Sequence, residues 1–392
     1  MPALGHNKSR FQIQGAILNM ENSNGPATFS EIDHFFMERA LHLAQRARGR
    51  TSPNPLVGCV IVRDGLIVGE GYHQKAGTPH AEVHALRSAG DLAQNATAYV
   101  TLEPCSHYGR TPPCAEALIR AGIRRVVVAM VDPNPLVSGH GIQLLQESGI
   151  QVEIGLLGEE AQALNEVFIR AITTALPFVV YKCAMTLDGK IATAGGDSSW
   201  VSSEASRRLT QTYRDQFDVI LVGSGTVRAD DPKLTCRLPG GRDPVRLIID
   251  GTLSLAEEAK VLTSSVTAPC IIATTQAADP EKLERLQRRP GIEIWQYPET
   301  RYVPLRQVLG ALCERGWSSV LLEGGGQLAG QMFKEKLIQK VEFFIAPKLA
   351  GDGPSPLSGF TLEKMAAAIP LEKLNVSLAT GDIHVTGYVL PE

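Results

Sequence analysis

Four residues of the chain could together bind a metal ion and move a proton: His80, Glu82, Cys105 and Cys114. One imidazole and two thiolates supply the three protein ligands of a catalytic zinc site, in which a fourth position stays open for water. Zinc lowers the pKa of that water towards neutrality, and Glu82 remains free to pass a proton to a departing amine. The set is therefore typical of hydrolytic deamination of a nucleobase ring.

The spacing of the two cysteines departs from the general deaminase signature, P-C-x-x-C. Cys114 lies nine positions after Cys105, with SHYGRTPP between them. Two other interpretations stay open on these residues alone. The His-x-Glu pair could be a solvated helix start, and His107 could be a fourth ligand that closes the site and leaves it purely structural.

Two helix starts and one strand end must bring the ligands together. His80 begins a predicted helix that ends at Ala89, Cys105 follows the predicted strand 96–102, and Cys114 begins a predicted helix over 114–122. The positive N-terminal ends of the two helices would also favour thiolate over thiol.

The flanking sequence predicts a three-layer α/β domain around these ligands. Ser30 and Asp33 form a capping-box pattern before a helix, and Asp64-Gly65 is a turn pair between two strands of a hairpin. Further strands are predicted at 125–131 and 151–157, and a single helix over 158–175.

A second alternating series begins after Leu176-Pro177, where proline ends the preceding helix. Short apolar strands are predicted at 178–185, 218–223, 245–250, 270–275 and 319–325, with antiparallel strands at 341–347 and 383–390 added at one side of the sheet. The predicted organisation is an N-terminal extension (1–30), a deaminase domain (31–175) and a second domain (176–392).

Composition excludes several classes of protein. The chain has 392 residues, of which 44% are hydrophobic and 20% charged, with a formal net charge of −3. That balance argues against general affinity for nucleic acid or anionic membranes. Seven scattered cysteines argue against a disulfide framework, and residues 1–30 are too polar for a secretory signal. We expect a cytoplasmic enzyme that does not enter a membrane.

The second domain lacks a complete dinucleotide-binding fingerprint, G-x-G-x-x-G. Gly223-Ser224-Gly225 follows a predicted strand, but Arg228 stands where the third glycine would be. The turn 324–326 consists of three glycines and precedes a predicted helix near Gln327. It could be a pyrophosphate seat or simply a tight turn between a strand and a helix.

Longer motifs identify a resemblance that covers about residues 31–390. The chain resembles the bifunctional deaminase-reductase of riboflavin biosynthesis at TSPNPLVGCVIV, GEGYHQKAGTPHAEVHAL, TLEPCSHYGRTPPC, VDPNPLVSGHG, MTLDGKIA, SSWVSS, GSGTVRADDPKLT and LLEGGGQLAG. The spacing of nine positions between the cysteines is that of the family, so it now supports the resemblance.

The resemblance implies a cytidine-deaminase-like three-layer αβα domain followed by a dihydrofolate-reductase-like α/β domain. The small-molecule substrate would be 2,5-diamino-6-(5-phosphoribosylamino)pyrimidin-4(3H)-one, which loses its 2-amino group as ammonia. NADPH would then reduce the ribosyl group to ribityl. The family also implies a homo-oligomer, with a dimer favoured, built through the reductase half.

The resemblance further implies roles for individual residues. His80, Cys105 and Cys114 would hold zinc, and Glu82 would carry the proton. The pyrimidine and phosphate pocket would be lined by Asn54, His73, His107, Arg110 and Asn134. NADPH would contact Ala184, Trp200, Ser202, Thr226, Asp230, Gly325 and Gly326. The ribosyl phosphate side would be contacted by Ser198, Arg214, Leu234, Arg237 and Glu323. The proton source of the reductase stays open among Asp230, Glu323 and Lys182.

Three other functions fit the sequence less well. A zinc deaminase of another base or nucleoside with a non-reductase C-terminal domain would not explain the second-half motifs. A non-enzymatic zinc scaffold would not explain the free Glu82. A fusion with one decayed half would not explain why both halves carry the expected residues.

Overall fold

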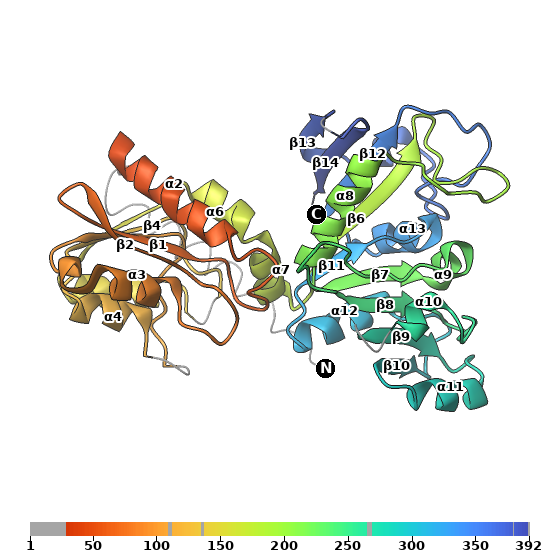
Figure 1. Cartoon of the computed structure of the whole chain (residues 1–392), viewed down its shortest axis with the longest axis horizontal. Helices are drawn as coiled ribbons and strands as arrows, with labels where there is room; N and C mark the ends of the chain where they lie inside the picture. Colours follow the sequence, from red (N-terminus) through yellow and green to blue (C-terminus); the bar gives the residue numbers. More distant parts are fainter. Residues whose placement is uncertain (1–28, 109–111, 135–136, 265–268, 379, 391–392) are drawn as a thin grey trace, which may run out of the picture. The chain divides into compact units, whose positions relative to one another are not determined.

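The computed structural model describes residues 29–108, 112–134, 137–264, 269–378 and 380–390, which fold into two units (Figure 1). The first unit contains the chain up to Ala47 together with Leu56–Leu164. The second contains Arg48–Pro55 and the chain from Asn165 onward. The units therefore separate one helix earlier than the predicted boundary near residue 175. The predicted extension 1–30, apart from residues 29 and 30, lies outside the described residues.

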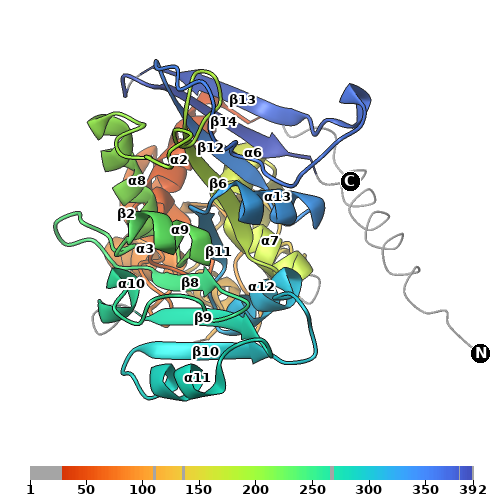
Figure 2. The same cartoon turned by 90° about the vertical axis from the view of Figure 1, so that its right-hand side faces the viewer.

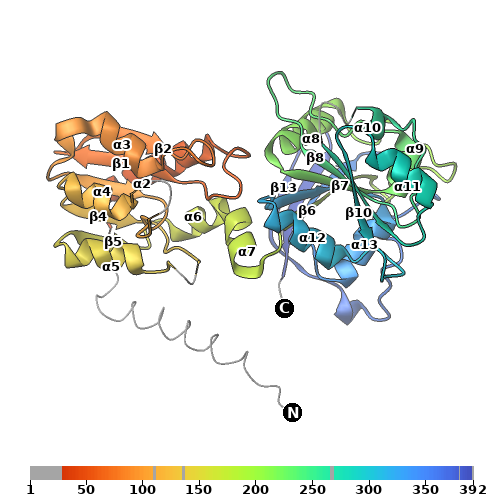
Figure 3. The ribbon, with the colours of Figure 1, turned by 90° about the horizontal axis from the view of Figure 1, so that it is seen from below.

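The first unit is a five-stranded sheet between helices, in the order β2-β1-β3-β4-β5. Strand β1 is antiparallel to β2 and β3, and β3, β4 and β5 are parallel. Helices α2 and α6 lie on one face, and α3, α4 and α5 lie on the other (Figures 1 and 3). The elements are α2 (Glu31–Gln45), β1 (Gly58–Arg63), β2 (Leu66–Tyr72), α3 (Ala81–Ala89), η1 (Gly90–Ala93), β3 (Thr97–Val100), α4 (Cys114–Arg120), β4 (Arg125–Val128), α5 (His140–Glu147), β5 (Gln151–Ile154) and α6 (Gly158–Leu164).

Two local predictions about this unit are confirmed, and one is wrong. Ser30 and Asp33 form the capping box of α2, and Asp64-Gly65 makes the hairpin turn between β1 and β2 with both φ angles positive. The helix predicted over 158–175 is instead two helices, α6 and α7 (Glu166–Thr174), because Asn165 leaves helical geometry at φ −103° and ψ 17°.

The second unit is a nine-stranded sheet in the order β10-β9-β8-β7-β11-β6-β12-β14-β13. The first seven strands in this order, which begin with β10 and end with β12, are parallel to one another. Strand β14 is antiparallel to β12 and β13, as the tail predicted, although β12 itself runs parallel to β6. The strands are β6 (Phe178–Thr186), β7 (Val219–Gly223), β8 (Val245–Ile249), β9 (Cys270–Thr275), β10 (Ile292–Tyr297), β11 (Ser319–Leu322), β12 (Lys340–Ala346), β13 (Leu371–Ser377) and β14 (Ile383–Val389).

Alternating strand residues build a hydrophobic core on each face of this sheet. Val179 and Leu221 belong to the core under α12 and α13, whereas Ile220 and Ile248 belong to the core under α9, α10 and α11. Figure 2 shows α12 and α13 on the opposite side of the strands from α8 and α9. The helices of this unit besides α7 are α8 (Glu204–Gln216), α9 (Ser224–Asp230), α10 (Lys260–Thr263), α11 (Pro280–Gln287), α12 (Leu305–Glu314), α13 (Gly326–Lys334) and η2 (Met365–Ala367).

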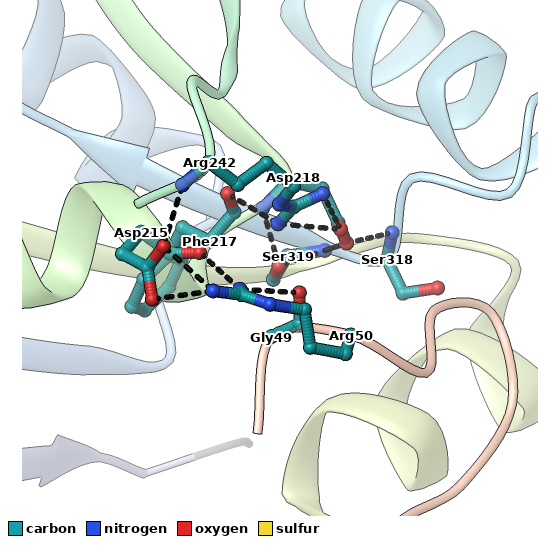
Figure 4. Close-up of polar contacts among 8 residues, drawn as sticks. All are labelled: Gly49, Arg50, Asp215, Phe217, Asp218, Arg242, Ser318 and Ser319. Atoms are coloured by element: carbon teal, nitrogen blue, oxygen red, sulfur yellow. Dashed lines mark hydrogen bonds and ion pairs between the residues drawn. The ribbon is translucent and has the colours of Figure 1, made fainter. Parts of the chain in front are cut away.

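The short segment Arg48–Pro55 packs against the C-terminal end of α8. Arg50 donates to both carboxylate oxygens of Asp215 at 2.8 and 2.9 Å and to its backbone carbonyl at 2.9 Å (Figure 4). Gly49 has φ +74°, and a Cβ there would lie 2.5 Å from the Gln216 Cα. Only glycine permits both that conformation and that approach.

Among the described residues, no helix is both long and apolar enough to span a bilayer.

Candidate active sites

The three predicted zinc ligands converge in the first unit. The Nδ1 atom of His80 lies 3.2 Å from the sulfur of Cys114 and 3.6 Å from that of Cys105. All three ligand atoms lie within 4.8 Å of one another. Tetrahedral coordination with ordinary Zn–N and Zn–S bond lengths separates neighbouring ligand atoms by about 3.5–3.8 Å. The spacing therefore fits a zinc ion.

Local structure explains this convergence. His80 is the N-cap of α3, and Cys114 is the first residue of α4. The backbone N–H of Cys114 donates to the Cys105 sulfur at 3.3 Å. Gly71 of β2 lets α3 lie directly against the sheet, because a Cβ there would be 2.3 Å from the Ala81 carbonyl oxygen. The predicted arrangement of two helix starts and a strand end is thus what the structure contains.

The charges of the two thiols also fit a cation between them. Hydrogen bonding from Cys114, followed by His80, lowers the pKa of Cys105 to about 4. The same pair interaction, together with burial, raises the pKa of Cys114 well above its ordinary range. A divalent metal would stabilise both sulfurs as thiolates.

Glu82 lies beside the triad without being part of it. Its side chain is buried, with a relative exposure of 3%, and its Oε2 atom has no hydrogen-bond partner within the described structure. Burial, and secondarily the charge of Cys105, raises the pKa of Glu82 to about 7. An acid with a pKa near neutrality can both accept and release a proton, as general acid-base catalysis requires.

The other predicted deaminase residues are distributed more widely. His73 is buried next to His80, with the ring centroids 5.5 Å apart, and its Nδ1 lies 3.2 Å from the Pro79 carbonyl oxygen. His107 is exposed and is not a member of the metal-binding cluster found among the described residues, which argues against a closed four-ligand site. Asn54 lies in the segment 48–55, which packs in the second unit. Arg110 lies outside the described residues.

Asp132 and Glu103 are two acidic residues that the sequence motifs did not single out. Asp132 accepts the Asn134 N–H at 2.8 Å and interacts electrostatically with His107, so it joins two predicted pocket residues. Glu103 is buried and accepts the N–H groups of Asp132 and Gly141 at 3.1 and 2.8 Å. The available signal was the position of Glu103 in TLEPC, two residues before the predicted zinc ligand Cys105.

The second unit contains a cavity of about 800 Å³ at the carboxyl ends of β6, β7 and β11. Parallel α/β sheets bind ligands at this edge. All predicted reductase residues except Gly326 and Leu234 line the cavity, namely Ala184, Ser198, Trp200, Ser202, Arg214, Thr226, Asp230, Arg237, Glu323 and Gly325. Residues distant in sequence are thus brought to one place that is large enough for a dinucleotide.

The glycine turn between β11 and α13 forms one wall of the cavity. Gly325 is the N-cap of α13, and its N–H donates to the Thr226 hydroxyl at 3.0 Å, which joins this turn to α9. Gly326 serves packing, because a Cβ there would lie 2.3 Å from the Ser355 carbonyl oxygen. Leu234 is 3% exposed and belongs to the core cluster rather than to the cavity wall.

Arg214 and Glu323 form a buried ion pair within the cavity wall. Two N–O distances of 2.9 Å join the guanidinium to the carboxylate, and each side chain is 10% exposed. Burial would raise the pKa of Glu323, but Arg214 outweighs burial and holds that pKa below its ordinary value. Arg237, in contrast, forms no ion pair with a carboxylate among the described residues. Its backbone N–H donates to the side-chain oxygen of Gln211.

Helix α8 contributes cavity residues that the sequence analysis missed. Arg207, Thr210 and Gln211 line the cavity beside Arg214. Their i, i+3, i+4 and i+7 spacing places all four on one helix face. Arg207 lies over the Trp200 ring, 4.2 Å from its centroid. The helical spacing was visible in the sequence, but only the cavity shows that this face is turned towards a ligand.

Comparisons with known families match both units. The family described as "Cytidine and deoxycytidylate deaminase zinc-binding region" matches residues 30–130. The family described as "RibD C-terminal domain" matches residues 177–385. The second match leaves no support for the alternative of a deaminase joined to a non-reductase domain.

Complete relatives match nearly the whole chain. The riboflavin biosynthesis protein RibD of Bacillus amyloliquefaciens is 46% identical over 358 residues, which cover 91% of this chain and 96% of that protein. RibD of Escherichia coli is 44% identical over 353 residues, covering 86% and 94%. The solved structure of Acinetobacter baumannii RibD superposes with a TM-score of 0.81 at 39% identity, covering 92% and 99%. A diaminohydroxyphosphoribosylaminopyrimidine deaminase/5-amino-6-(5-phosphoribosylamino)uracil reductase from Thermotoga maritima gives 0.82 at 37%, with the same coverage.

Proposed function

Because the chain belongs to the RibD family of riboflavin biosynthesis proteins, we propose a role for each residue of its two sites. The protein is a bifunctional enzyme with a zinc-dependent deaminase half and an NADPH-dependent reductase half. It converts 2,5-diamino-6-(5-phosphoribosylamino)pyrimidin-4(3H)-one to 5-amino-6-(5-phosphoribosylamino)uracil and then to the ribitylamino product. The observation that carries the residue assignment is the convergence of His80, Cys105 and Cys114 beside Glu82, whose Oε2 atom has no hydrogen-bond partner in the described structure.

In the deaminase, His80, Cys105 and Cys114 would hold zinc, which when bound supplies an acidified water as nucleophile. Glu82 takes up a proton at its free carboxylate and delivers it to the amino group that leaves as ammonia. The buried surroundings of Glu82 keep bulk water away from this proton. We assign the pocket for the pyrimidine ring and the phosphate to five residues: Asn54, His73, His107, Arg110 and Asn134.

In the reductase, NADPH bound in the cavity would supply the hydride. We assign the cofactor to the wall formed by Thr226, Asp230 and the glycine turn at Gly325, together with Ala184, Trp200 and Ser202. Gly326 supports this wall by close packing, whereas Leu234, which was expected on the ribosyl phosphate side, lies in the hydrophobic core. The start of α13 suits a pyrophosphate, because the first N–H groups of a helix have no acceptor within the helix, although that of Gly325 already donates to the Thr226 hydroxyl.

The ribosyl phosphate is assigned to Arg237 as its principal cation. The Glu323 carboxylate already balances the charge of Arg214, so that pair orients the wall and can contact sugar hydroxyls. We therefore assign Glu323 to holding Arg214 and not to donating a proton, since its lowered pKa keeps it anionic at neutral pH. Ser198, whose hydroxyl donates to Asp230 at 2.8 Å, and Lys182 complete this side of the cavity.

We assign deaminase and reductase activity to the predicted domains 31–175 and 176–392. The family matches at 30–130 and 177–385 support this division.

A homodimer through the reductase domain is proposed from edge strand β13, where Leu374 and Val376 are 59% and 58% exposed. Exposed apolar residues on an edge strand favour pairing with another chain.

A cytoplasmic location is proposed from the chemistry of the cysteines. All seven are free, and two of them are assigned to zinc, which requires them reduced. The reliance of the second reaction on NADPH fits the same compartment.

A coupled assay tests the proposed function. Purified protein is supplied with zinc, the diaminopyrimidinone ribosylamine phosphate and NADPH, and both ammonia release and NADPH oxidation are measured. We expect one ammonia released and one NADPH consumed per substrate. Ammonia without NADPH oxidation would refute the reductase, and neither signal from zinc-loaded protein would refute both assignments.

A further inference from the structure

One arginine at the edge of the cofactor cavity has no role in the assignments above. Arg228, in α9, donates through Nη1 to the hydroxyl of Ser254 at 2.7 Å. Within the described part of the chain it forms no ion pair with a carboxylate, unlike Arg214, whose charge Glu323 balances. Arg228 is also exposed, so its positive charge is accessible to a ligand.

Arg228 lies next to the cavity wall. Its neighbours Gly225, Thr226, Ala229 and Asp230 all line the cavity. The Nη2 atom of Arg228 lies 4.0 Å from the position that a Cβ on Gly225 would occupy, so the guanidinium borders the cavity at this glycine. A ligand that passes over Gly225 would therefore come within reach of the arginine.

The partner of Arg228 is rigidly held. The Ser254 hydroxyl donates to Asp250 Oδ1 at 3.0 Å, and Asp250 Oδ2 accepts the N–H of Leu255 at 2.9 Å. Asp250 is 1% exposed and directly follows β8. The turn after β8 thus fixes the serine oxygen, which in turn orients the guanidinium.

The order of the strands indicates which part of the cofactor reaches this point. Two cavity groups are assigned to the ribosyl substrate side: Lys182 lies in β6, and Glu323 follows β11. The glycine turn assigned to the pyrophosphate also follows β11. The next strands in the sheet are β7 and then β8. With the nicotinamide beside the substrate and the pyrophosphate at the turn, the adenosine end of a bound cofactor would extend over α9 towards β8 and Arg228.

We propose that Arg228, oriented by Ser254, binds the 2′-phosphate of NADPH and makes the reductase prefer NADPH to NADH. The two cofactors differ only in that phosphate, which is a dianion on the adenosine ribose. A guanidinium pairs with phosphate oxygens through two parallel hydrogen bonds, and an arginine near this ribose is a recurring means of accepting the 2′-phosphate. The inference rests on the proposed placement of NADPH in this cavity.

A binding experiment tests the arginine without turnover. Calorimetry compares 2′-AMP with 5′-AMP on the wild-type protein and on Arg228→Gln. We expect the wild type to bind 2′-AMP more tightly and the variant to lose about tenfold in 2′-AMP affinity, a change worth about 1.4 kcal/mol, with 5′-AMP affinity unchanged. Equal affinity of wild type and variant for 2′-AMP would overturn the proposal.

Steady-state kinetics provide the second measurement. In Arg228→Gln, kcat/KM for NADPH should fall about tenfold through KM, while kcat/KM for NADH and ammonia release stay constant. Arg288→Gln, which changes an exposed arginine of the segment after α11 paired with Glu284, is the matched control and should keep the wild-type ratio. Loss of the preference in Arg207→Gln but not in Arg228→Gln would overturn the proposal. A wild type that oxidises no NADPH would instead refute the reductase function itself.

Discussion

Arg214 of α8 and Glu323 at the end of β11 form a two-pronged ion pair inside the reductase cavity, with both N–O distances at 2.9 Å. Each side chain is 10% exposed, so the charges have little access to water. Arg214 also donates to the Thr235 carbonyl at 3.1 Å, which ties three separate segments together. The pair therefore fixes the shape of the cavity as well as its charge.

Removing one partner of this pair should affect both stability and the reductase. Glu323→Gln leaves the Arg214 charge buried without its counter-ion, which typically costs about 3–5 kcal/mol. We expect a lower thermal unfolding midpoint and impaired NADPH oxidation, with ammonia release retained. Arg214→Lys keeps the charge but cannot form both bonds, so it should lose less stability. If Glu323→Gln were as stable as the wild type, the pair would not hold the cavity wall.

The role assigned to Glu82 predicts a separation between metal binding and catalysis. Glu82→Gln retains size and burial but cannot transfer a proton, so ammonia release should fall by about 10²–10⁴-fold. Zinc content, measured by elemental analysis, should remain at the wild-type level, because Glu82 is not a ligand. NADPH oxidation with the deaminated intermediate serves as the internal control. Normal ammonia release by this variant would contradict the assignment.

The zinc ligands can be distinguished from the other cysteines by the same two measurements. Cys105→Ala and Cys114→Ala each remove one of the three protein ligands, so we expect loss of zinc and of ammonia release with reductase activity preserved. Cys313→Ala, in α12, is the matched control, because it lies outside the metal-binding cluster. Full zinc content in either ligand variant would show that the site is assembled differently.

The convergence of the three proposed zinc ligands could be predicted from the sequence, because they lie at the ends of short elements with strong local signals. His80 and Cys114 begin helices, and local patterns locate helix starts well. The break at Asn165 was missed because the residues on both sides continue an apolar helical pattern. Nothing in that pattern shows that Asn165 itself leaves helical geometry.

The reductase cavity could be predicted only through resemblance, and the reason is physical. Its walls come from the ends of three parallel strands and one face of α8, and parallel strands pair across long stretches of sequence. No local spacing shows that Arg214 meets Glu323, which lies 109 residues away. The resemblance named both residues as substrate contacts, whereas the structure adds that they neutralise each other.

The hydrogen bonds of Asp188, which lies just beyond the carboxyl end of β6, predict that the stability of the protein depends on pH. Its carboxylate accepts the Thr186 hydroxyl and the N–H groups of Ala350 and Gly351, and these bonds lower its pKa from 3.8 to about 2. A lowered folded-state pKa contributes stability above pH 4, which is lost as the pH falls from about 4 to about 2. Asp188→Asn should flatten the stability curve in that window when acid unfolding is followed by circular dichroism. If Asp188→Asn and the wild type lost the same stability between pH 4 and pH 2, the hydrogen bonds of the Asp188 carboxylate would not stabilise the fold.

The dependence of the zinc site on sheet geometry gives a last prediction, at Gly71. This residue pairs with Cys59 in β1 and faces the first turn of α3, where an added Cβ would lie 2.3 Å from the Ala81 carbonyl oxygen and 2.5 Å from the Ala85 nitrogen. Both contacts are with backbone, so Gly71→Ala must displace α3, and overpacking of this kind costs about 1–3 kcal/mol. Because His80 caps that helix and Glu82 lies in its first turn, zinc content and ammonia release should both fall while NADPH oxidation persists.

Gly310→Ala is the matched control for this substitution. Gly310 lies within α12, a Cβ added there would meet no atom within 4 Å, and its φ is not positive, so alanine should be neutral or slightly stabilising. Zinc content, ammonia release and thermal unfolding should be measured on both variants in parallel. If Gly71→Ala bound zinc and released ammonia like Gly310→Ala, close contact between α3 and β2 would not be what positions the ligands.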